Sequence, residues 1–130
     1  MGYYRVGSHT KYRLMYHLVW LPKYRKRVLE NGIKSRLTEL FFECAEINSW
    51  KIIELNIQKD HVHIILQLKQ TTSVSDAVQR FKGGSSKVIR SEFPELKEFL
   101  WGKNSWAEGY FAETVGRIAE NAITEYVKNQ

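Results

Sequence analysis

Two histidines near the middle of the chain are separated by one apolar residue. His61, Val62 and His63 lie where polar and apolar residues alternate, and residues i and i+2 of a strand point to the same face of a sheet. The two imidazoles would therefore stand side by side while Val62 points into the core. This arrangement suits two ligands of one divalent metal ion. Two half-exposed strand histidines without any ligand would satisfy the same pattern.

A tyrosine and a glutamine at the C-terminal end could complete such a site. Tyr126 and Gln130 are four residues apart, so a helix would place them on one side, about one turn apart. The Gln130 amide oxygen could be a third metal ligand, and the Tyr126 phenol could be a nucleophile. A phenol of pKa about 10 is weak at neutral pH and needs a metal-polarised substrate or a nearby base. The structural alternatives are a packed Tyr126 and an exposed Gln130.

The elements that would position these groups begin with a strand and a helix. A mixed apolar and aromatic run predicts a strand over residues 12–21, which Pro22 ends. Helical spacing of apolar residues predicts a helix over about 28–48 that packs against a sheet. The apolar stripe of this helix consists of Ile33, Leu37, Leu40, Phe41, Cys44 and Ile47. Strict alternation then predicts two strands, 52–58 and 61–68, joined as a hairpin.

A second helix, a strand and a last helix follow. Ser73 with Asp76 three residues on resembles an N-terminal capping box, and the helix is predicted to run towards Phe93, with Gly83 and Gly84 as a weak point. A short strand is predicted over 110–115 and a final helix over 117–130. The order β-α-β-β-α-β plus a C-terminal helix predicts a single ferredoxin-like (RRM-like) α+β domain over residues 1–130. Two helices would cover one face of its antiparallel sheet and leave the other face free.

Composition narrows the class of protein. The 130 residues are 43% hydrophobic and 26% charged, which is typical of one globular domain and argues against disorder. The only cysteine, Cys44, cannot form an internal disulfide, and the N-terminus does not resemble a secretion signal. No apolar run approaches the roughly 20 residues of a membrane helix. We therefore expect a cytoplasmic protein without a membrane span.

The positive charge is concentrated at the start of the chain. The net charge is +6, yet residues 1–29 hold seven Lys or Arg and no Asp or Glu. Tyrosines and a tryptophan are interleaved with these bases: Tyr3, Tyr4, Tyr12, Tyr16, Trp20 and Tyr24. Bases with aromatic rings between them favour a single-stranded nucleic acid as partner. An aromatic strand followed by a solvated basic turn explains the same pattern equally well.

The His-x-His strand, the basic turn before it, and the second helix and the Tyr126 segment after it follow one another along the chain. Together these four motifs resemble the HUH (His-hydrophobe-His) single-tyrosine transposases of small insertion sequences with hairpin ends. KDHVHIIL resembles the metal-binding strand of the family, and YHLVWLPKYR, residues 16–25, resembles its first strand and basic turn. Residues 73–86 resemble its second helix, and residues 109–116 followed by Tyr126 and Gln130 resemble its last strand and catalytic helix. The resemblance covers nearly the whole chain.

The resemblance implies a role for each of these residues. Tyr126 would attack a DNA phosphate and form a 5′-phosphotyrosine, while His61, His63 and Gln130 would bind Mg²⁺ or Mn²⁺. Family members act as homodimers on single-stranded DNA with hairpin ends, and the tyrosine helix of one subunit can complete the site of the other. The bases expected to contact DNA phosphates are Lys23, Arg25, Arg27, Arg80, Lys82 and Lys87.

Other functions remain to be weighed against this one. A non-catalytic single-stranded nucleic-acid-binding domain would explain the charge but not the paired histidines with the Tyr126 helix. A domesticated relative that acts on chromosomal repeats would have the same chemistry. A zinc hydrolase or deaminase is disfavoured, because His-Glu-x-x-His and the Glu of His-x-Glu are absent.

Overall fold

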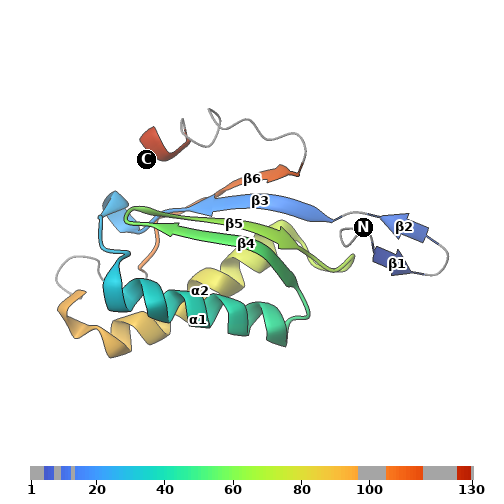
Figure 1. Cartoon of the computed structure of the whole chain (residues 1–130). Coiled ribbons are helices and arrows are strands. Elements are labelled where there is room, and N and C mark those ends of the chain that lie inside the picture. Colours follow the sequence, from blue (N-terminus) through green and yellow to red (C-terminus); the bar gives the residue numbers. More distant parts are fainter. Residues whose placement is uncertain (1–4, 8–9, 13, 97–104, 116–125, 130) are drawn as a thin grey trace.

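The computed structural model describes residues 5–7, 10–12, 14–96, 105–115 and 126–129. Two short strands, β1 (Arg5–Gly7) and β2 (Thr10–Tyr12), precede the main domain. The domain contains β3 (Met15–Trp20), the 3-10 turn η1 (Lys23–Arg25), α1 (Asn31–Ile47), β4 (Lys51–Gln58), β5 (His61–Gln67), α2 (Val74–Glu92), the 3-10 turn η2 (Pro94–Leu96) and β6 (Phe111–Thr114) (Figure 1). Residues 126–128 form a helical turn.

Four strands form one antiparallel sheet in the order β4-β5-β3-β6. This order and the two helices confirm the predicted ferredoxin-like α+β fold. The hairpin of β4 and β5 is also confirmed, and a β-bulge between Ile52 and Glu54 shifts its register. Both helices lie on one side of the sheet, whereas the 126–128 turn lies on the other side (Figure 1). We call the side away from the helices the open face; it carries His61 and His63.

The core fills the space between the sheet and the helices. Alternation in β5 sends Val62, Ile64 and Leu66 to the helix side, where each is fully buried. Four aromatic rings pack against one another at the centre in edge-to-face, stacked and tilted arrangements: Trp20, Phe41, Phe81 and Trp106. Aromatic side chains bury the largest apolar areas, so this cluster joins β3 to both helices and to residue 106.

Helix α2 begins as the sequence predicts and then runs without interruption. The Ser73 hydroxyl accepts a hydrogen bond from the Asp76 backbone N–H at 3.0 Å, which satisfies a donor that the first turn leaves free. Gly83 and Gly84 lie within the helix, so the predicted weak point does not break it. Within the described residues, no helix is both long enough and apolar enough to cross a membrane.

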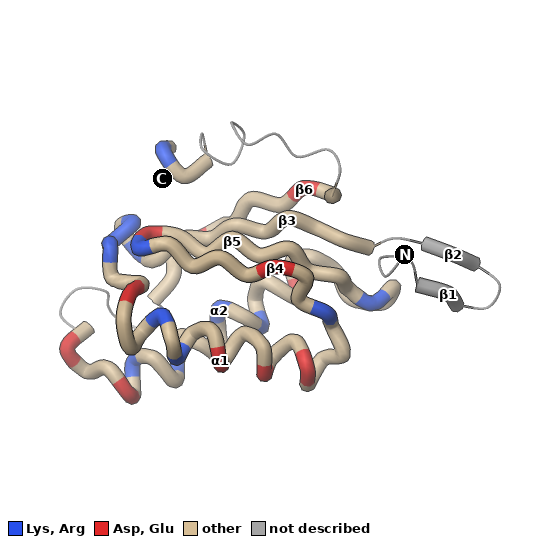
Figure 2. Tube along the Cα trace, in the orientation of Figure 1, with Lys and Arg blue, Asp and Glu red and all other residues tan. Residues whose placement is uncertain are grey.

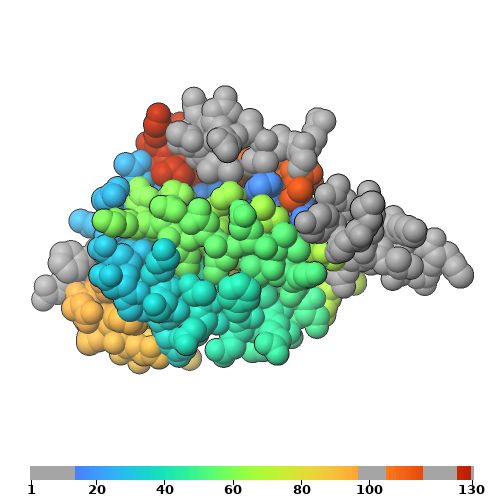
Figure 3. Space-filling view, in the orientation of Figure 1, coloured from blue at the N-terminus to red at the C-terminus, as the bar shows by residue number. Residues whose placement is uncertain are grey.

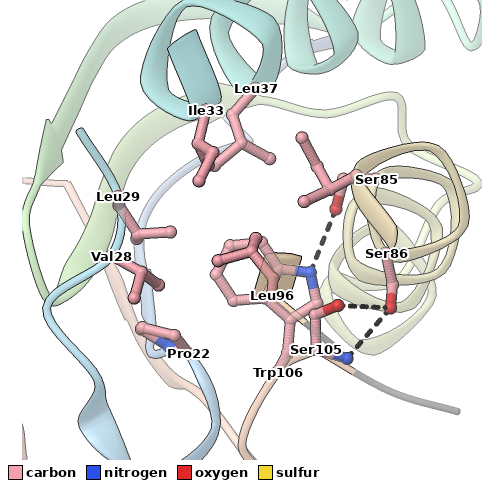
Figure 4. A pocket seen from close by; sticks show the side chains of 11 residues that line it. Pro22, Val28, Leu29, Ile33, Leu37, Ser85, Ser86, Leu96, Ser105 and Trp106 are labelled. Carbon is pink, nitrogen blue, oxygen red and sulfur yellow. Dashed lines mark hydrogen bonds between the residues drawn. The ribbon is translucent and has the colours of Figure 1, made fainter. Parts of the chain in front are cut away.

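Three polar residues of α2 hold the segment 105–109, which leads into β6. Ser85 Oγ accepts from Trp106 Nε1 at 3.0 Å, and Ser86 Oγ accepts from the Ser105 N–H at 2.9 Å (Figure 4). Lys82 Nζ donates to the carbonyls of Ala107 and Gly109 at 2.9 and 2.6 Å. The adjoining apolar cavity, about 10 Å³, holds at most one water molecule, so it is part of the core.

The structure corrects two predictions from the sequence and leaves most of a third untested. The strand predicted over residues 12–21 is shorter, because Tyr12 belongs to β2, which pairs with β1 in a separate two-stranded sheet. Ile47, predicted to be part of the core stripe of α1, is 77% exposed, since the helix ends there and turns towards β4. Of the predicted final helix, residues 117–125 and 130 lie outside the described residues.

Candidate functional site

Cross-strand pairing arranges the open face in rows, because paired residues of neighbouring strands point to the same side. One row contains Asn56, His63, Val19 and Phe111, and the next contains Glu54, Ile65, His17 and Glu113. Gln58 and His61 form a third row at the end of the β4–β5 hairpin. The two histidines of the His-x-His motif are thus neighbours on the open face, as the sequence predicts.

An acidic residue orients His61. The Nδ1 of His61 lies 2.9 Å from Oδ1 of Asp60, and the Asp60 side chain is only 14% exposed. A carboxylate beside Nδ1 fixes the proton on this nitrogen and leaves the Nε2 lone pair free. Metal-binding histidines characteristically have this second interaction. The sequence analysis missed Asp60, although its position next to His61 in KDHVH was a signal for it.

A third histidine, His17 of β3, lies against His63. Its Nδ1 is 3.1 Å from Nε2 of His63, and the two rings stack with centroids 5.4 Å apart. Burial lowers the pKa of both imidazoles; for His17 the nearby Glu113 and Glu54 oppose this shift. Both rings are therefore neutral at neutral pH, and one of them donates its N–H to the other. A cation bound through Nε2 of His63 would replace this hydrogen bond.

Tyr126 packs on the open face. Its ring centroid is 5.8 Å from that of Phe111 on β6, which shares a row with His63. The phenol oxygen is buried and has no hydrogen-bond partner among the described residues, and burial raises the pKa of the phenol. Tyr126 is therefore a protonated phenol at neutral pH, held on the same face as the histidines. Gln130, its predicted companion, lies outside the described residues.

The basic turn after β3 lies at the end of the sheet that carries His61. The Leu29 backbone N–H donates to the Lys59 carbonyl at 2.9 Å, so this turn runs beside the β4–β5 turn. Figure 2 shows Lys and Arg gathered at this turn, and the 126–129 segment adds one further base, Lys128. Lys23 lies near the ring of Tyr24, and Arg27 is exposed.

Arg25 differs from its neighbours because its side chain has partners within the protein. Its Nη1 donates to the Val127 carbonyl at 2.8 Å, and its Nε is 3.6 Å from Oδ2 of Asp60. Residues 126–129 accordingly lie against the turn after β3 in the space-filling view (Figure 3). The sequence analysis predicted Arg25 only as a phosphate contact.

The three predicted DNA contacts on α2 are not near the histidines, because α2 covers the opposite side of the sheet. Arg80 donates to Asp76 and to Asn48, and Lys87 is exposed. Lys82 already donates to two backbone carbonyls, and burial lowers its pKa to about 8. The structure therefore separates the six predicted bases into a group beside His61 and a group across the sheet.

Comparisons with known proteins agree with this fold. The chain matches the family described as "Transposase IS200 like" over residues 10–130. It is 34% identical over 124 residues to the ISDra2 transposase TnpA of Deinococcus radiodurans, covering 95% of this chain and 89% of that protein. It is 29% identical over 130 residues to the transposase for insertion sequence element IS200 of Salmonella typhimurium, covering 100% and 85%.

Two solved structures are also similar. A crystal structure of a D. radiodurans R1 protein assigned as a transposase has a TM-score of 0.89 and 32% identity, with 97% of each chain covered. The structure of a REP-associated tyrosine transposase bound to a REP hairpin has a TM-score of 0.60 and covers 94% of this chain and 68% of that one. At 12% identity, the second likeness shows the fold alone.

Proposed function

The chain belongs to the family of IS200-like transposases, and we propose that it cuts and rejoins single-stranded DNA through a covalent bond between Tyr126 and a DNA phosphate. A transposase is an enzyme that cuts and joins DNA, and the family membership supports that coarser statement directly. The finer proposal concerns which residues carry out the chemistry. The observation that carries it is that His61, His63 and Tyr126 share the open face of one sheet.

The proposed reaction exchanges one phosphate ester for another. The Tyr126 phenol oxygen attacks phosphorus, the bond from phosphorus to the 3′ oxygen breaks, and the 5′ end stays attached to the protein as a phosphotyrosine. The phenol proton is lost and the departing 3′ oxygen is protonated. Because the number of ester bonds is unchanged, the step needs no ATP, and the free 3′-hydroxyl can reverse it on another strand.

The residues present fit a divalent cation. The interaction of Asp60 with Nδ1 leaves Nε2 of His61 as a free donor, and His63 is neutral at neutral pH because burial lowers its pKa. We propose that these two imidazoles, with the Gln130 amide oxygen, hold Mg²⁺ or Mn²⁺. When bound, the ion would offset the negative charge on the phosphate oxygens.

The proposed substrate is single-stranded DNA with a hairpin at each element end. The bases Lys23 and Arg27 lie beside His61 and would contact the strand to be cut. Arg80 and Lys87 lie on α2, across the sheet from the histidines, and would contact another part of the DNA. The REP hairpin held by the similar solved transposase supports the choice of a hairpin.

We further propose that two copies act together as a homodimer. Two protomers present two active sites and two basic surfaces, which suits the joining of two element ends. Sedimentation of the DNA-free protein should give about twice the 15.3 kDa mass of one chain. A species with the mass of one chain, at the protein concentrations that support cleavage, would contradict this part of the proposal.

The test is formation of a covalent protein–DNA adduct. The protein is incubated with Mn²⁺ or Mg²⁺ and a single-stranded hairpin end from its own genomic flank, and the products are run on a denaturing gel. We expect a shifted band that resists denaturant, requires the metal, and is lost in Tyr126→Phe and His61→Ala. Tyr16→Phe, which removes a phenol from the core side of β3, is the matched control and should keep the band.

Two outcomes would contradict the proposal. An adduct that persists in Tyr126→Phe would mean that another group is the nucleophile. Binding of the correct hairpin end without any adduct would instead support a non-catalytic nucleic-acid-binding domain.

A further inference from the structure

The turn after β3 has an unusual backbone. Tyr24 has φ 61° and Arg25 has φ 50°, the left-handed region that residues with a Cβ seldom enter. Three backbone hydrogen bonds hold the turn: the Arg25 N–H donates to the Pro22 carbonyl at 2.8 Å, the Lys26 N–H to the Lys23 carbonyl at 3.4 Å, and the Lys23 N–H to the Ser105 carbonyl at 2.9 Å. Two consecutive residues in this region persist only where the surroundings fix them. This turn directs the Arg25 side chain towards its two partners.

Those partners belong to two different parts of the site. Nη1 of Arg25 donates to the Val127 carbonyl at 2.8 Å, in the helical turn that carries Tyr126. Its Nε lies 3.6 Å from Oδ2 of Asp60, whose other oxygen is 2.9 Å from Nδ1 of His61. A continuous chain of polar contacts therefore runs from the Tyr126 turn through Arg25 and Asp60 to His61.

The chemistry of the contacts requires an arginine. A guanidinium presents several N–H groups in one rigid plane, so it can donate to a carbonyl and face a carboxylate at the same time. A lysine ammonium has a single nitrogen on a flexible stem, whereas Arg25 meets its two partners with two different nitrogens, Nη1 and Nε. Carbonyls near the C-terminal end of a helix also attract cations. Asp60 is largely buried, at 14% exposed, whereas the Arg25 side chain is 38% exposed.

We propose that Arg25 is a positioning residue that couples the Tyr126 turn to His61, rather than a contact to DNA phosphate. Through Val127 it holds the Tyr126 turn against the sheet. Through Asp60 it keeps the His61 imidazole oriented with Nε2 free. The inference rests on the proposed function, because the coupling serves catalysis only if Tyr126 and His61 act in one reaction. The contacts themselves are testable without DNA.

The first test measures docking of the Tyr126 turn in the DNA-free, metal-free protein. Hydrogen–deuterium exchange of a peptide that covers residues 126–129 is compared among wild type, Arg25→Ala, Arg25→Lys and Lys26→Ala. We expect faster exchange in Arg25→Ala, an intermediate rate in Arg25→Lys, and no change in Lys26→Ala, which removes a charge from the same turn. Unchanged exchange in Arg25→Ala would overturn the proposal.

The second test measures the connection to His61. Mn²⁺ is titrated calorimetrically into the DNA-free protein. We expect Arg25→Ala and Asp60→Asn each to weaken Mn²⁺ binding by about 10-fold, the typical effect of removing a group that orients a metal-binding histidine. Lys26→Ala should bind Mn²⁺ like wild type. Equal affinity in wild type and Arg25→Ala would contradict the coupling. Circular dichroism melting of each variant separates this effect from loss of folding, and Arg25→Lys retains the charge if Arg25→Ala fails to fold.

The third test uses cleavage kinetics to separate positioning from phosphate binding. Loss of a positioning residue should lower kcat and leave KM for the hairpin DNA nearly unchanged, whereas loss of a phosphate contact should raise KM. A raised KM with unchanged kcat in Arg25→Ala would overturn the proposal. The proposed function itself would fail on a different result, an adduct that persists in Tyr126→Phe. The hydrogen–deuterium exchange and Mn²⁺ measurements would still test the contacts of Arg25 in that case.

Discussion

At the scale of single residues, three buried or half-buried polar groups have partners that position the side chains around them, whereas the buried Tyr126 hydroxyl has no hydrogen-bond partner among the described residues. His17 faces His63, Asp60 faces His61, and Ser85 faces Trp106. Leaving one of these buried groups without a hydrogen-bond partner would lower the free energy of unfolding by about 1–3 kcal/mol. These partners therefore fix ring orientation on the open face and the path of the chain on the helix side.

Lys82 gives a prediction about pH. Burial lowers its pKa from 10.5 to about 8, while Glu108 opposes the shift. Between these values the unfolded chain binds the proton more tightly than the folded protein, so the contribution of Lys82 to the free energy of unfolding rises with pH. We expect the unfolding free energy of wild type minus that of Lys82→Met to become more positive from about pH 7 to about pH 9. Urea denaturation at each pH measures both values.

The control for this prediction is Lys87→Met, which removes an exposed lysine from the same helix. The change with pH should be larger for Lys82→Met than for this control, because only Lys82 is held between α2 and the carbonyls of residues 107 and 109. An equal change with pH for both variants would show that the ammonium is not buried between α2 and residues 107–109.

At the scale of elements, α2 has two functions along its length. Its buried side packs Phe81 and Ile89 into the core, and the polar groups of Lys82, Ser85 and Ser86 hold the segment that leads into β6. Since β6 carries Phe111, on which Tyr126 packs, α2 positions the open face from the opposite side of the sheet.

The glycines of α2 give a prediction about helix stability. A Cβ added at Gly84 meets no atom within 4 Å, and alanine favours the helix over glycine by about 1 kcal/mol. We expect Gly84→Ala to raise the free energy of unfolding by about 0.5–1 kcal/mol, measured by urea denaturation. Gly109→Ala is the contrasting variant; its φ of +83° favours glycine, so we expect a loss of about 1 kcal/mol.

Gly84→Ala also tests whether hairpin DNA contacts the surface of α2 at Gly84. If Gly84→Ala stabilises the protein and yet weakens binding of hairpin DNA, the bare backbone there is needed for close approach of the nucleic acid. If Gly84→Ala destabilises the protein, the conclusion that a Cβ at this position meets no neighbouring atom would be contradicted.

At the scale of the whole molecule, the basic turn after β3 and His61, a proposed metal ligand, lie at the same end of the sheet. The basic turn after β3, the β4–β5 turn and the 126–129 segment lie together (Figure 2). Polyanion binding at such a surface releases counterions, so affinity falls with salt. For a single strand the slope of log affinity against log salt is about −0.7 per neutralised phosphate.

The salt dependence distinguishes bases that bind DNA from bases that only solvate the surface. We expect Arg27→Ala to reduce the magnitude of this slope by about 0.7, measured by fluorescence anisotropy with the hairpin end. Lys51→Ala, at the far end of β4 from His61, is the matched control and should leave the slope unchanged. Equal slopes for Arg27→Ala and wild type would remove Arg27 from the binding surface.

The sequence alone determined the features that depend on neighbours along the chain. Strand periodicity put His61 and His63 on one face with Val62 in the core, and Ser73 marked the start of α2 through a bond to Asp76. The same local pattern could not distinguish β2 from β3, because alternation does not say which strand is the partner. The order of helices and strands was nevertheless sufficient to predict the ferredoxin-like sheet.

Only the tertiary structure decided what each charged side chain contacts. Arg25 and Lys82 look alike in the sequence as exposed bases, yet one joins Asp60 to Val127 and the other binds the carbonyls of residues 107 and 109. Val127 follows Arg25 by about a hundred positions along the chain. No local pattern records such a contact, since it exists only after the sheet has brought the two segments together.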